Sequence, residues 1–212
     1  HAFDLSLARP RLDELSPRSV APDRPVYDRS KAAGEVEVRK VIDRGLDATI
    51  VNPTGVIGPI DHGPSRMNLV LHSAARGRLP VVVHGGFDWV DVRDVAVGLI
   101  AAADRGRVGE NYLLGGHQAS AKHLGRLAAA LNGHLGPVVA IPGVLATRLA
   151  PAGERIGRRL GSDVFTPASI GTLVEHPIVD STKASRELGH DPRALEDTVR
   201  DFVRYYEGEA QL

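Results

Sequence analysis

Two side chains that could share a proton-transfer step stand four positions apart early in the chain. Tyr27 and Lys31 open a segment that favours a helix, and one helical turn places residues four apart on the same face. A phenol ordinarily titrates near about pH 10, and a neighbouring fixed cation lowers that pKa. The pair could therefore act as a general acid or base with its supporting cation. The spacing also fits an ordinary tyrosine beside an exposed lysine, and the scarcity of lysine in this arginine-rich chain favours a specific role.

Other groups with catalytic potential have simpler explanations. Asp91 and Asp94 could form a carboxylate pair, but they stand where an apolar helical pattern begins, and negative side chains cap helix N-termini. The nine histidines form neither His-x-x-x-His nor His-Glu-x-x-His, and there is no cysteine, so we expect no metal site. No Gly-x-Ser-x-Gly motif marks an α/β-hydrolase. A basic cluster is interpreted as solvated surface, with an anion site as the alternative: Arg155, Arg158 and Arg159.

Composition restricts the class of protein and its partners. The 212 residues, 42% hydrophobic and 25% charged, are ordinary for a soluble globular chain. Lys plus Arg equal Asp plus Glu at 26 each, so we expect no nucleic-acid partner. The absence of cysteine excludes disulfides and thiolate chemistry and fits a cytoplasmic location. Residues 127–147 carry no charged side chain but are broken by glycine and proline, so we expect no membrane segment.

Helices and strands alternate through the first 115 residues. After an irregular segment, 1–26, a helix from Tyr27 to Arg44 ends at Gly45, and its buried stripe is expected to be Ala33, Val36, Val41 and Ile42. A strand, 48–51, enters an expected loop at 54–59. Further elements are expected as follows: a helix at 65–75, strands at 79–84 and 87–91, a helix at 92–104 with Val95, Ala96, Leu99, Ile100 and Ala103 buried, and a strand at 112–114.

The remaining third is mostly helical. Ser120 caps one helix and a strand is expected at 137–141, followed by a weakly helical stretch at 143–160 and a helix start at Thr166-Pro167. A short strand at 178–179 leads into a helix at 181–188, and the last helix has the clearest apolar period, from Leu195 to Tyr206. The alternation predicts an α/β protein with a parallel sheet.

Five segments in order resemble one family, the extended short-chain dehydrogenase/reductases. Tyr-x-x-x-Lys followed by Ala-x-Gly-Glu resembles the active-site helix of that family. Residues 52–59, Asn-Pro-Thr-Gly-Val-Ile-Gly-Pro, resemble its strand-to-loop segment beside the nicotinamide. Residues 89–96, 110–115 and 180–189 resemble its later signatures. The sequence of residues 53–59 resembles that segment in the dihydroflavonol reductase-like and 3β-hydroxysteroid dehydrogenase-like branch of the NAD-dependent epimerase/dehydratases.

The resemblance implies a fold and two domains. Residues 1–115 would be the later part of a Rossmann-like nucleotide-binding domain that carries the Tyr/Lys helix. Residues 116–212 would be mainly a smaller, mostly helical substrate-binding region, with 176–190 packing back on the first domain. Relatives often dimerise through helices of this kind, so a homodimer is expected.

The resemblance also implies roles for particular residues. Tyr27 would be the general acid and Lys31 would lower the Tyr27 pKa and hold the nicotinamide ribose, while the backbone of Pro53, Thr54, Gly55 and Val56 would line the carboxamide. Substrate contacts are assigned to Asn52, Met67, His84 and Trp89, although Trp89 fits a core aromatic equally well, and Met67 and His72 are undecided. The cofactor would be NAD or NADP, because the residues that read the ribose 2′ position follow a strand that this sequence does not contain.

The sequence departs from the family pattern in its glycines. No Gly-x-x-Gly-x-x-Gly turn is present, and Gly85-Gly86 and Gly115-Gly116 lack the required spacing. The catalytic Ser or Thr of the family would align just before His1, and Ser6, Ser16 and Ser19 are interpreted as loop residues. We therefore expect this chain to be the C-terminal portion of a longer reductase.

Three functions remain open. The leading one is an NAD(P)-dependent oxidoreductase that reduces a carbonyl or oxidises a secondary alcohol of a small molecule. The alternatives are a nucleotide-sugar epimerase or dehydratase, and a relative that binds nucleotide or a partner protein without turnover.

Overall fold

The computed structural model of the chain describes residues 2–5, 11–63, 65–79, 81–137, 139–146, 148 and 177–209. At its centre, strand β2 (Ile50–Pro53) runs parallel to strand β6 (Asn111–Leu114), with Ile50 opposite Asn111 and Pro53 opposite Leu114. Parallel neighbours need a long crossover, and here the chain passes through residues 54–110 between them. Strand β6 is buried along its whole length, as parallel strands covered on both faces are.

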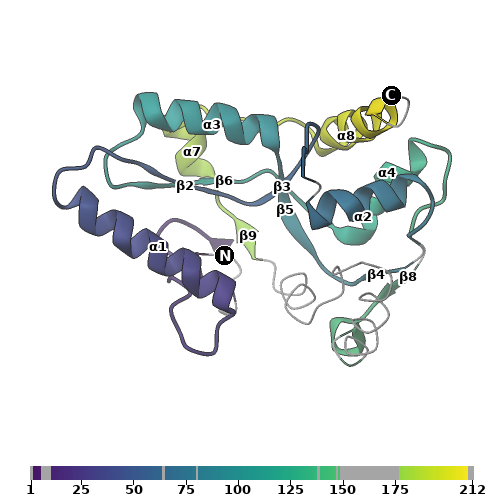
Figure 1. Ribbon diagram of the computed structural model, residues 1–212, viewed down its shortest axis with the longest axis horizontal. Coiled ribbons are helices and arrows are strands. Elements are labelled where there is room, and N and C mark those ends of the chain that lie inside the picture. Colours follow the sequence, from purple (N-terminus) through teal and green to yellow (C-terminus); the bar gives the residue numbers. More distant parts are fainter. Residues whose placement is uncertain are drawn as a thin grey trace.

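Helices lie on both sides of this pair (Figure 1). Helices α3 (Val92–Arg105) and α7 (Thr182–Leu188) lie on one side, and α1 (Val26–Ile42) lies on the other. The small residues of α3 face the strands, since a Cβ on Gly98 would lie 2.5 Å from Leu114 Cδ1. The core between them contains Val90, Val95, Ala101, Ala102, Tyr112, Leu114, Ala184 and Leu188. Helix α7 therefore packs on α3 and β6, although it is distant from both in the sequence.

A second sheet joins three further strands. Strand β5 (Gly86–Asp91) pairs in parallel with β3 (Gly55–Ile57) and antiparallel with β7 (His117–Ser120). The chain passes from β6 to β7 through Gly115 and Gly116, which lie close to β5. A Cβ on Gly116 would lie 1.9 Å from the Trp89 carbonyl oxygen, so only glycine fits there.

A separate helical group packs against this sheet. It consists of α2 (Arg66–Ala75), α4 (Ala121–Ala130) and α8 (Leu195–Glu209), which lie together in Figure 1. Serine side chains cap two of them, because Ser65 accepts from the Asn68 amide and Ser120 from the His123 amide. Their shared core is built around Leu71, Trp89, Leu124, Val199 and Phe202.

Two short parallel pairs complete the described strands. Strand β4 (Val81–Val83) pairs with β8 (Val139–Ile141). Strand β1 (Arg11–Leu12) pairs with β9 (Ile178–Val179), and the ion pair between Arg11 and Asp180, 2.8 Å long, reinforces this contact.

The α/β class and the parallel pairing predicted from the sequence are confirmed. The prediction of a loop over 54–59 is wrong, because Gly55–Ile57 forms β3 against β5. The antiparallel strand β7 was not predicted, and β1 lies in the segment expected to be irregular. Both depend on partners far along the chain, which local composition does not reveal. The domain boundary at residue 115 stays a prediction.

On α1 the predicted buried stripe is wrong apart from half-buried Ile42, and on α3 it is right only at Val95. On α1 the buried side chains are Ala32 and Glu35, whereas Ala33, Val36 and Val41 are exposed. On α3 the buried residues include Val95, Gly98, Ala101 and Ala102, whereas Leu99 and Ile100 are 51% and 64% exposed. Small residues allow each helix backbone to approach its neighbour closely, and this close approach decides the buried face.

Some expectations cannot be compared with described residues. The expected helical stretch 143–160 beyond residue 148, the helix start at Thr166-Pro167 and the arginine cluster at 155–159 lie outside the described residues. None of the described helices is both long and apolar enough to cross a membrane.

Candidate active site

The structure brings Tyr27 and Lys31 together on the exposed face of α1. Pro25 precedes the helix with φ −51°, and Tyr27 lies in the first turn with 57% of its surface exposed. The Lys31 Nζ lies 5.2 Å from the centroid of the Tyr27 ring, within the range of a cation–π contact. A phenol and an ammonium group thus stand side by side and open to solvent. This arrangement can hold hydroxyl groups and exchange a proton.

A buried carboxylate one turn after Lys31 anchors this helix. Glu35 Oε1 accepts hydrogen bonds from Nε and Nη2 of Arg18, at 3.0 and 2.8 Å, and from Nε and Nη2 of Arg39, at 3.1 and 3.0 Å. Burial disfavours the charged form, but the hydrogen bonds and charges of Arg18 and Arg39 outweigh it and hold the pKa of Glu35 below its ordinary value. Glu35 therefore connects α1 to the preceding segment through a charged network.

Arg39 extends this network to the central strands. Its Nη1 donates to the Gly109 carbonyl at 3.0 Å, and its Nη2 donates to Asn111 Oδ1. Asn111 Nδ2 in turn donates to Asn52 Oδ1 at 2.7 Å, near the end of β2. The helix that carries Tyr27 is thereby connected to the segment that was expected to border the nicotinamide. The side chain of Asn52 takes part in this internal network, and its contact with a substrate stays a prediction.

The segment after β2 is held against its neighbours by Thr54. Its amide donates to the Leu114 carbonyl at 3.2 Å and its hydroxyl to Asp88 Oδ1 at 2.7 Å. Gly55 lies against β5, because a Cβ there would be 3.0 Å from the Asp88 carbonyl oxygen. Pro53 and Val56 are exposed, whereas Thr54 and Gly55 are half-buried. The predicted cofactor segment therefore has a fixed backbone with exposed positions at both ends.

The other predicted substrate residues occupy different environments. Met67 packs against the core shared by helices α2, α4 and α8. Trp89 is 2% exposed, and its indole donates to the Ala119 carbonyl at 2.9 Å. This burial supports the alternative interpretation of Trp89 as a core aromatic. His84 has an exposed side chain, while its amide donates to the Ile141 carbonyl.

The acidic pair at the start of α3 has structural partners. Asp91 caps the helix by accepting from the Arg93 amide at 2.8 Å, as predicted, and its carboxylate also binds the Arg93 guanidinium. Asp94 instead accepts from Arg193 Nη2 at 2.7 Å. Burial opposes the charge of Asp91, but hydrogen bonds from Arg93 outweigh this and lower its pKa. Arg93 also pairs with Asp201 of α8, so these ions fasten α8 to α3.

Ser16 and Ser19, which precede Tyr27 in the sequence, are both buried. Ser16 Oγ donates to Asp13 Oδ1 at 2.9 Å, and Ser19 is 1% exposed. Ser6 lies outside the described residues. Among the described residues, no group of three or more His, Asp or Glu could hold a metal ion.

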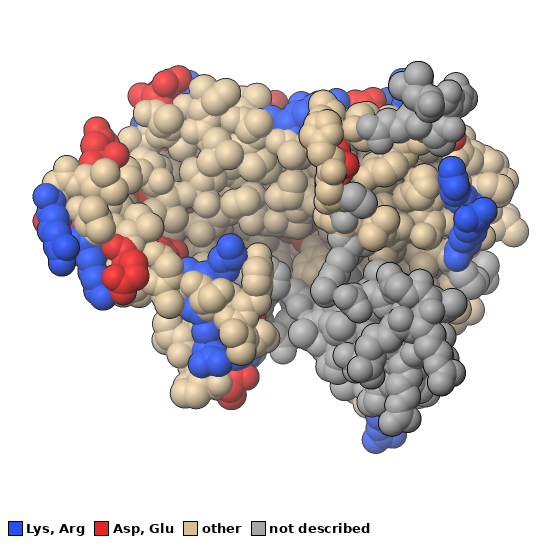
Figure 2. Space-filling model, viewed as in Figure 1, with Lys and Arg blue, Asp and Glu red and all other residues tan. Residues whose placement is uncertain are grey.

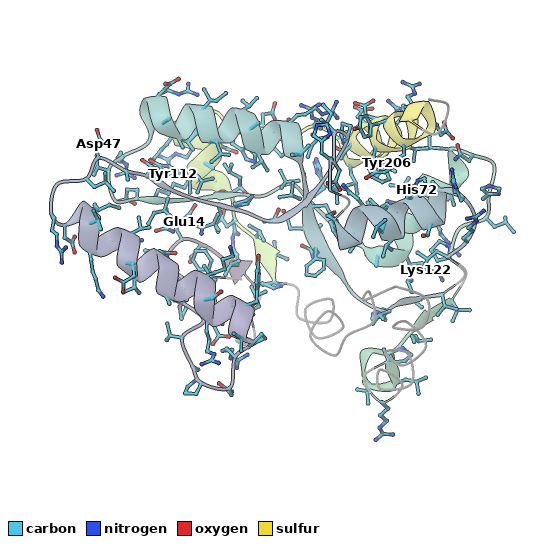
Figure 3. The ribbon with its side chains drawn as sticks, in the orientation of Figure 1. Glu14, Asp47, His72, Tyr112, Lys122 and Tyr206 are labelled. Atoms are coloured by element: carbon cyan, nitrogen blue, oxygen red, sulfur yellow. The ribbon has the colours of Figure 1, made fainter. Side chains whose placement is uncertain are left out.

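A pocket of about 440 Å³ lies elsewhere, between α2 and α8. The rings of His72 and Tyr206 on its wall lie 5.1 Å apart, in the helical group remote from α1 (Figure 3). Burial, with the charges of Arg76 and Arg78, lowers the pKa of His72. His72 was undecided from the sequence, and none of the predicted catalytic or cofactor residues lines this pocket.

The surface charge is mixed. On the face shown in Figure 2, basic and acidic side chains both occur along the α1 side, and uncharged residues form the greater part of the area. This agrees with the balanced charge of the chain.

Parallel strands with helices on both sides form a Rossmann-like α/β fold. The profile of the NAD dependent epimerase/dehydratase family matches residues 7–115, which are 109 of the 212 residues. The chain belongs to this family, and the resemblance seen in the sequence is confirmed.

Individual relatives carry several functions in their names. "Sterol demethylase protein B" of Methylococcus capsulatus is 34% identical over 183 residues, 85% of this chain and 56% of that protein. "Putative dihydroflavonol 4-reductase" of Synechocystis is 28% identical over 186 residues, 85% of this chain and 54% of that protein. The crystal structure of a nucleoside-diphosphate-sugar epimerase from Pseudomonas aeruginosa has a TM-score of 0.76 at 28% identity, covering 94% of this chain and 61% of that one.

The chain spans about half the length of the curated relatives it matches. Solved structures that share the fold at less than 25% identity include complexes with NAD and with NADPH. These comparisons support NAD or NADP as the cofactor of the family and leave the individual reaction undefined.

Three residues of the site were missed by sequence reasoning: Glu35, Asp88 and Asn111. Glu35 stands four positions after Lys31 on the same helix, and this spacing was the available signal. Asn111 lies in the 110–115 segment that resembles the family, but neither its role nor that of Asp88 was assigned, because their partners lie 28 to 72 positions away.

Proposed function

We propose that this chain carries the proton-transfer residues of an NAD(P)-dependent oxidoreductase that reduces a carbonyl or oxidises a secondary alcohol. The observation that carries the proposal is the Tyr27–Lys31 pair, exposed and 5.2 Å apart on a helix that buried Glu35 holds in place. Membership of an NAD-dependent family supports the cofactor. More than half of the Tyr27 surface is exposed, which supports its contact with a small molecule.

The roles follow from the chemistry of each group. A bound nicotinamide dinucleotide supplies or accepts the hydride. Tyr27 donates its phenolic proton to the substrate oxygen as the carbonyl becomes an alcohol, and accepts it back in the reverse direction. The Lys31 ammonium stabilises the phenolate that remains after proton donation, and its three N–H groups can also hold ribose hydroxyls. The backbone of Pro53, Thr54, Gly55 and Val56 holds the carboxamide.

The residues present fit one end of the dinucleotide. Lys31, Tyr27 and Pro53 are exposed and offer a cation, a hydroxyl and a carbonyl to the ribose and nicotinamide. The chain contains no Gly-x-x-Gly-x-x-Gly turn, so residues 1–212 do not supply that form of pyrophosphate site. In this proposal the cofactor is NAD or NADP, and His84 and Asn52 are the candidates for substrate contact that the core does not enclose.

A homodimer in the cytoplasm is part of the proposal. The support for the dimer is the apolar surface of α1, where Val36, Val38 and Val41 are 44%, 41% and 45% exposed. Light scattering should give twice the monomer mass, and Val38→Glu should shift the protein toward monomer. A monomer mass for the unsubstituted protein would overturn this part.

A nucleotide-sugar epimerase or dehydratase is the second candidate. Similarity to the nucleoside-diphosphate-sugar epimerase structure favours it, and transient oxidation of a sugar would use the same tyrosine and lysine. Incubation with UDP- and dTDP-sugars, followed by product analysis, separates this activity from turnover of simple ketones.

The decisive experiment replaces Tyr27 by Phe in the full-length protein. We expect turnover with a ketone panel to fall roughly 100- to 10,000-fold, with NAD(P)H affinity nearly unchanged, because only the transferable proton is lost. Tyr205→Phe on α8, the same change at a half-buried tyrosine, is the control. Near-normal turnover in Tyr27→Phe would refute the role. Dinucleotide binding without any turnover by the unsubstituted protein would favour a non-catalytic relative.

A further inference from the structure

The carboxyl ends of β2 and β6 lie side by side, with Pro53 opposite Leu114. In open α/β sheets, ligands bind in the crevice outside the carboxyl ends of parallel strands. Thr54 directly follows β2, and Gly115 and Gly116 directly follow β6. The side chain that lies between these two segments comes from neither strand. It is Asp88, in the middle of β5.

One oxygen of Asp88 binds both segments. Its Oδ1 accepts from the Thr54 hydroxyl at 2.7 Å and from the Gly116 amide at 2.6 Å. Both lengths lie at the short end of the hydrogen-bond range. The Thr54 amide also donates to the Leu114 carbonyl, so the two strand ends are joined directly and through Asp88.

The junction is too tight for alternative arrangements. A Cβ on Gly115 would lie 2.3 Å from Ser181 Oγ and 3.2 Å from Asp88 Oδ1. The Gly115 amide donates to the same Ser181 hydroxyl at 3.0 Å, and its carbonyl contacts His190 Nε2 at 2.7 Å. The glycines therefore hold the β6 end at a fixed distance from Asp88.

Burial of Asp88 has an energetic cost that these bonds must offset. Asp88 is 9% exposed, and within the described part of the chain it forms no ion pair with Lys or Arg. A buried carboxylate without a counterion is unfavourable unless hydrogen-bond donors surround it. Both donors bind the same oxygen, so the Asp88 carboxylate fixes the orientation of the Thr54 hydroxyl and the Gly116 amide.

We infer that Asp88 is a positioning residue for the dinucleotide site. It acts through Thr54: by fixing the hydroxyl of that residue, it fixes the backbone of Pro53, Thr54 and Gly55 that holds the carboxamide. The inference rests on the proposed function, because that function assigns the backbone segment to the nicotinamide.

The test uses three substitutions at Thr54 and Asp88 in the full-length protein. Thr54→Val keeps the shape and removes the hydroxyl, Thr54→Ser keeps the hydroxyl, and Asp88→Asn removes the charge. Thr49→Val is the matched control, because Thr49 stands just before the other end of β2 and its hydroxyl donates to the Arg107 carbonyl at 3.3 Å. Three measurements are made: NAD(P)H dissociation constants, kcat and KM for dinucleotide and substrate, and amide hydrogen exchange in peptides that cover 53–57 and 115–118.

We expect Thr54→Val and Asp88→Asn to raise the dinucleotide KM and dissociation constant roughly tenfold, because small displacements of a positioning segment are costly. Exchange should increase in both peptides. Thr49→Val should stay within about twofold of the unsubstituted protein, and Thr54→Ser, which keeps the hydroxyl, should lose less dinucleotide affinity than Thr54→Val. A merely structural role would lower the melting temperature and leave the dinucleotide KM of the folded protein unchanged.

Unchanged exchange in both peptides would overturn the inference, as would increased exchange with unchanged dinucleotide binding. Absence of dinucleotide binding by the unsubstituted protein would overturn the proposed function instead. In that case the exchange comparison still decides whether Asp88 holds the two segments together.

Discussion

Replacing Glu35 by Gln should destabilise the fold far more than the same change at Glu37, two positions along. The Glu35 side chain is 6% exposed, and one of its oxygens accepts four hydrogen bonds from Arg18 and Arg39. Glu37 is 70% exposed and pairs with Lys40, which is 55% exposed. Both substitutions keep the size of the side chain and its helix propensity, so the difference between them reports the buried charge.

The magnitude follows from the exposure of the arginines. Removing one partner of a fully buried ion pair costs about 3–5 kcal/mol, whereas exposed pairs contribute about 0–1 kcal/mol. Arg18 and Arg39 are 21% and 41% exposed, so water can partly solvate them once the charge of Glu35 is lost. Gln also retains one acceptor oxygen. We therefore expect a loss of about 2 kcal/mol for Glu35→Gln and about 0.3 kcal/mol for Glu37→Gln.

The effect should depend on pH in one direction. The folded-state pKa of Glu35 lies below its ordinary value, so its contribution is complete above the unfolded pKa of about 4.3. That contribution is lost as the pH falls through the folded-state value. The stability difference between the unsubstituted protein and Glu35→Gln should consequently be constant near pH 7 and decrease below about pH 4.

Urea and thermal unfolding at pH 7 and in the acidic range provide the assay. For a chain of this length, about 2 kcal/mol corresponds to a decrease in melting temperature of roughly 4–8 °C. A Glu35→Gln variant within about 0.5 kcal/mol of the unsubstituted protein at pH 7 would refute the reasoning. A difference that increases on acidification would refute the assigned sign.

Three further predictions concern backbone and capping positions, and each is measured by urea unfolding. Gly34→Ala, within α1, should stabilise by about 0.5–1 kcal/mol, because nothing lies within 4 Å of the new Cβ, and destabilisation would contradict this. Gly116→Ala should destabilise by about 3 kcal/mol, since its Cβ would lie 1.9 Å from the Trp89 carbonyl, and a neutral result would show that the segment can move. Ser65→Ala removes the acceptor of the Asn68 amide and should cost about 1 kcal/mol, whereas Ser65→Gly should cost only a few tenths, and equal losses would exclude capping as the cause.

The sequence predicted the elements better than their buried faces. Periodicity located α8 and its core residues Val199, Phe202 and Val203. On α3 it was right at Val95 but wrongly expected Leu99 and Ile100 to be buried, because large apolar residues dominate such patterns. The interface with β6 instead requires small residues such as Gly98, and a single sequence does not show which neighbour approaches closely.

In the candidate site, too, the sequence identified residues related by local spacing and missed those whose partners lie far along the chain. Tyr27 and Lys31 were recognisable because their relation is local, one turn of one helix. Glu35 was not, since an acidic residue on a helix usually faces solvent, and Arg18 meets it from 17 positions away. Asp88 escaped detection because strand alternation assumes one exposed face, whereas β5 is buried along almost its whole length.

The pairing of β1 with β9 has a consequence for how the chain is made. The Arg11–Asp180 ion pair joins residues 169 positions apart. At a synthesis rate of roughly 5–20 residues per second, β9 is translated about 8 to 34 seconds after β1. During that interval the backbone groups of β1 are open to other strands of the nascent polypeptide or to chaperones. Synthesis of this protein thus includes a period in which β1 is available for incorrect pairing.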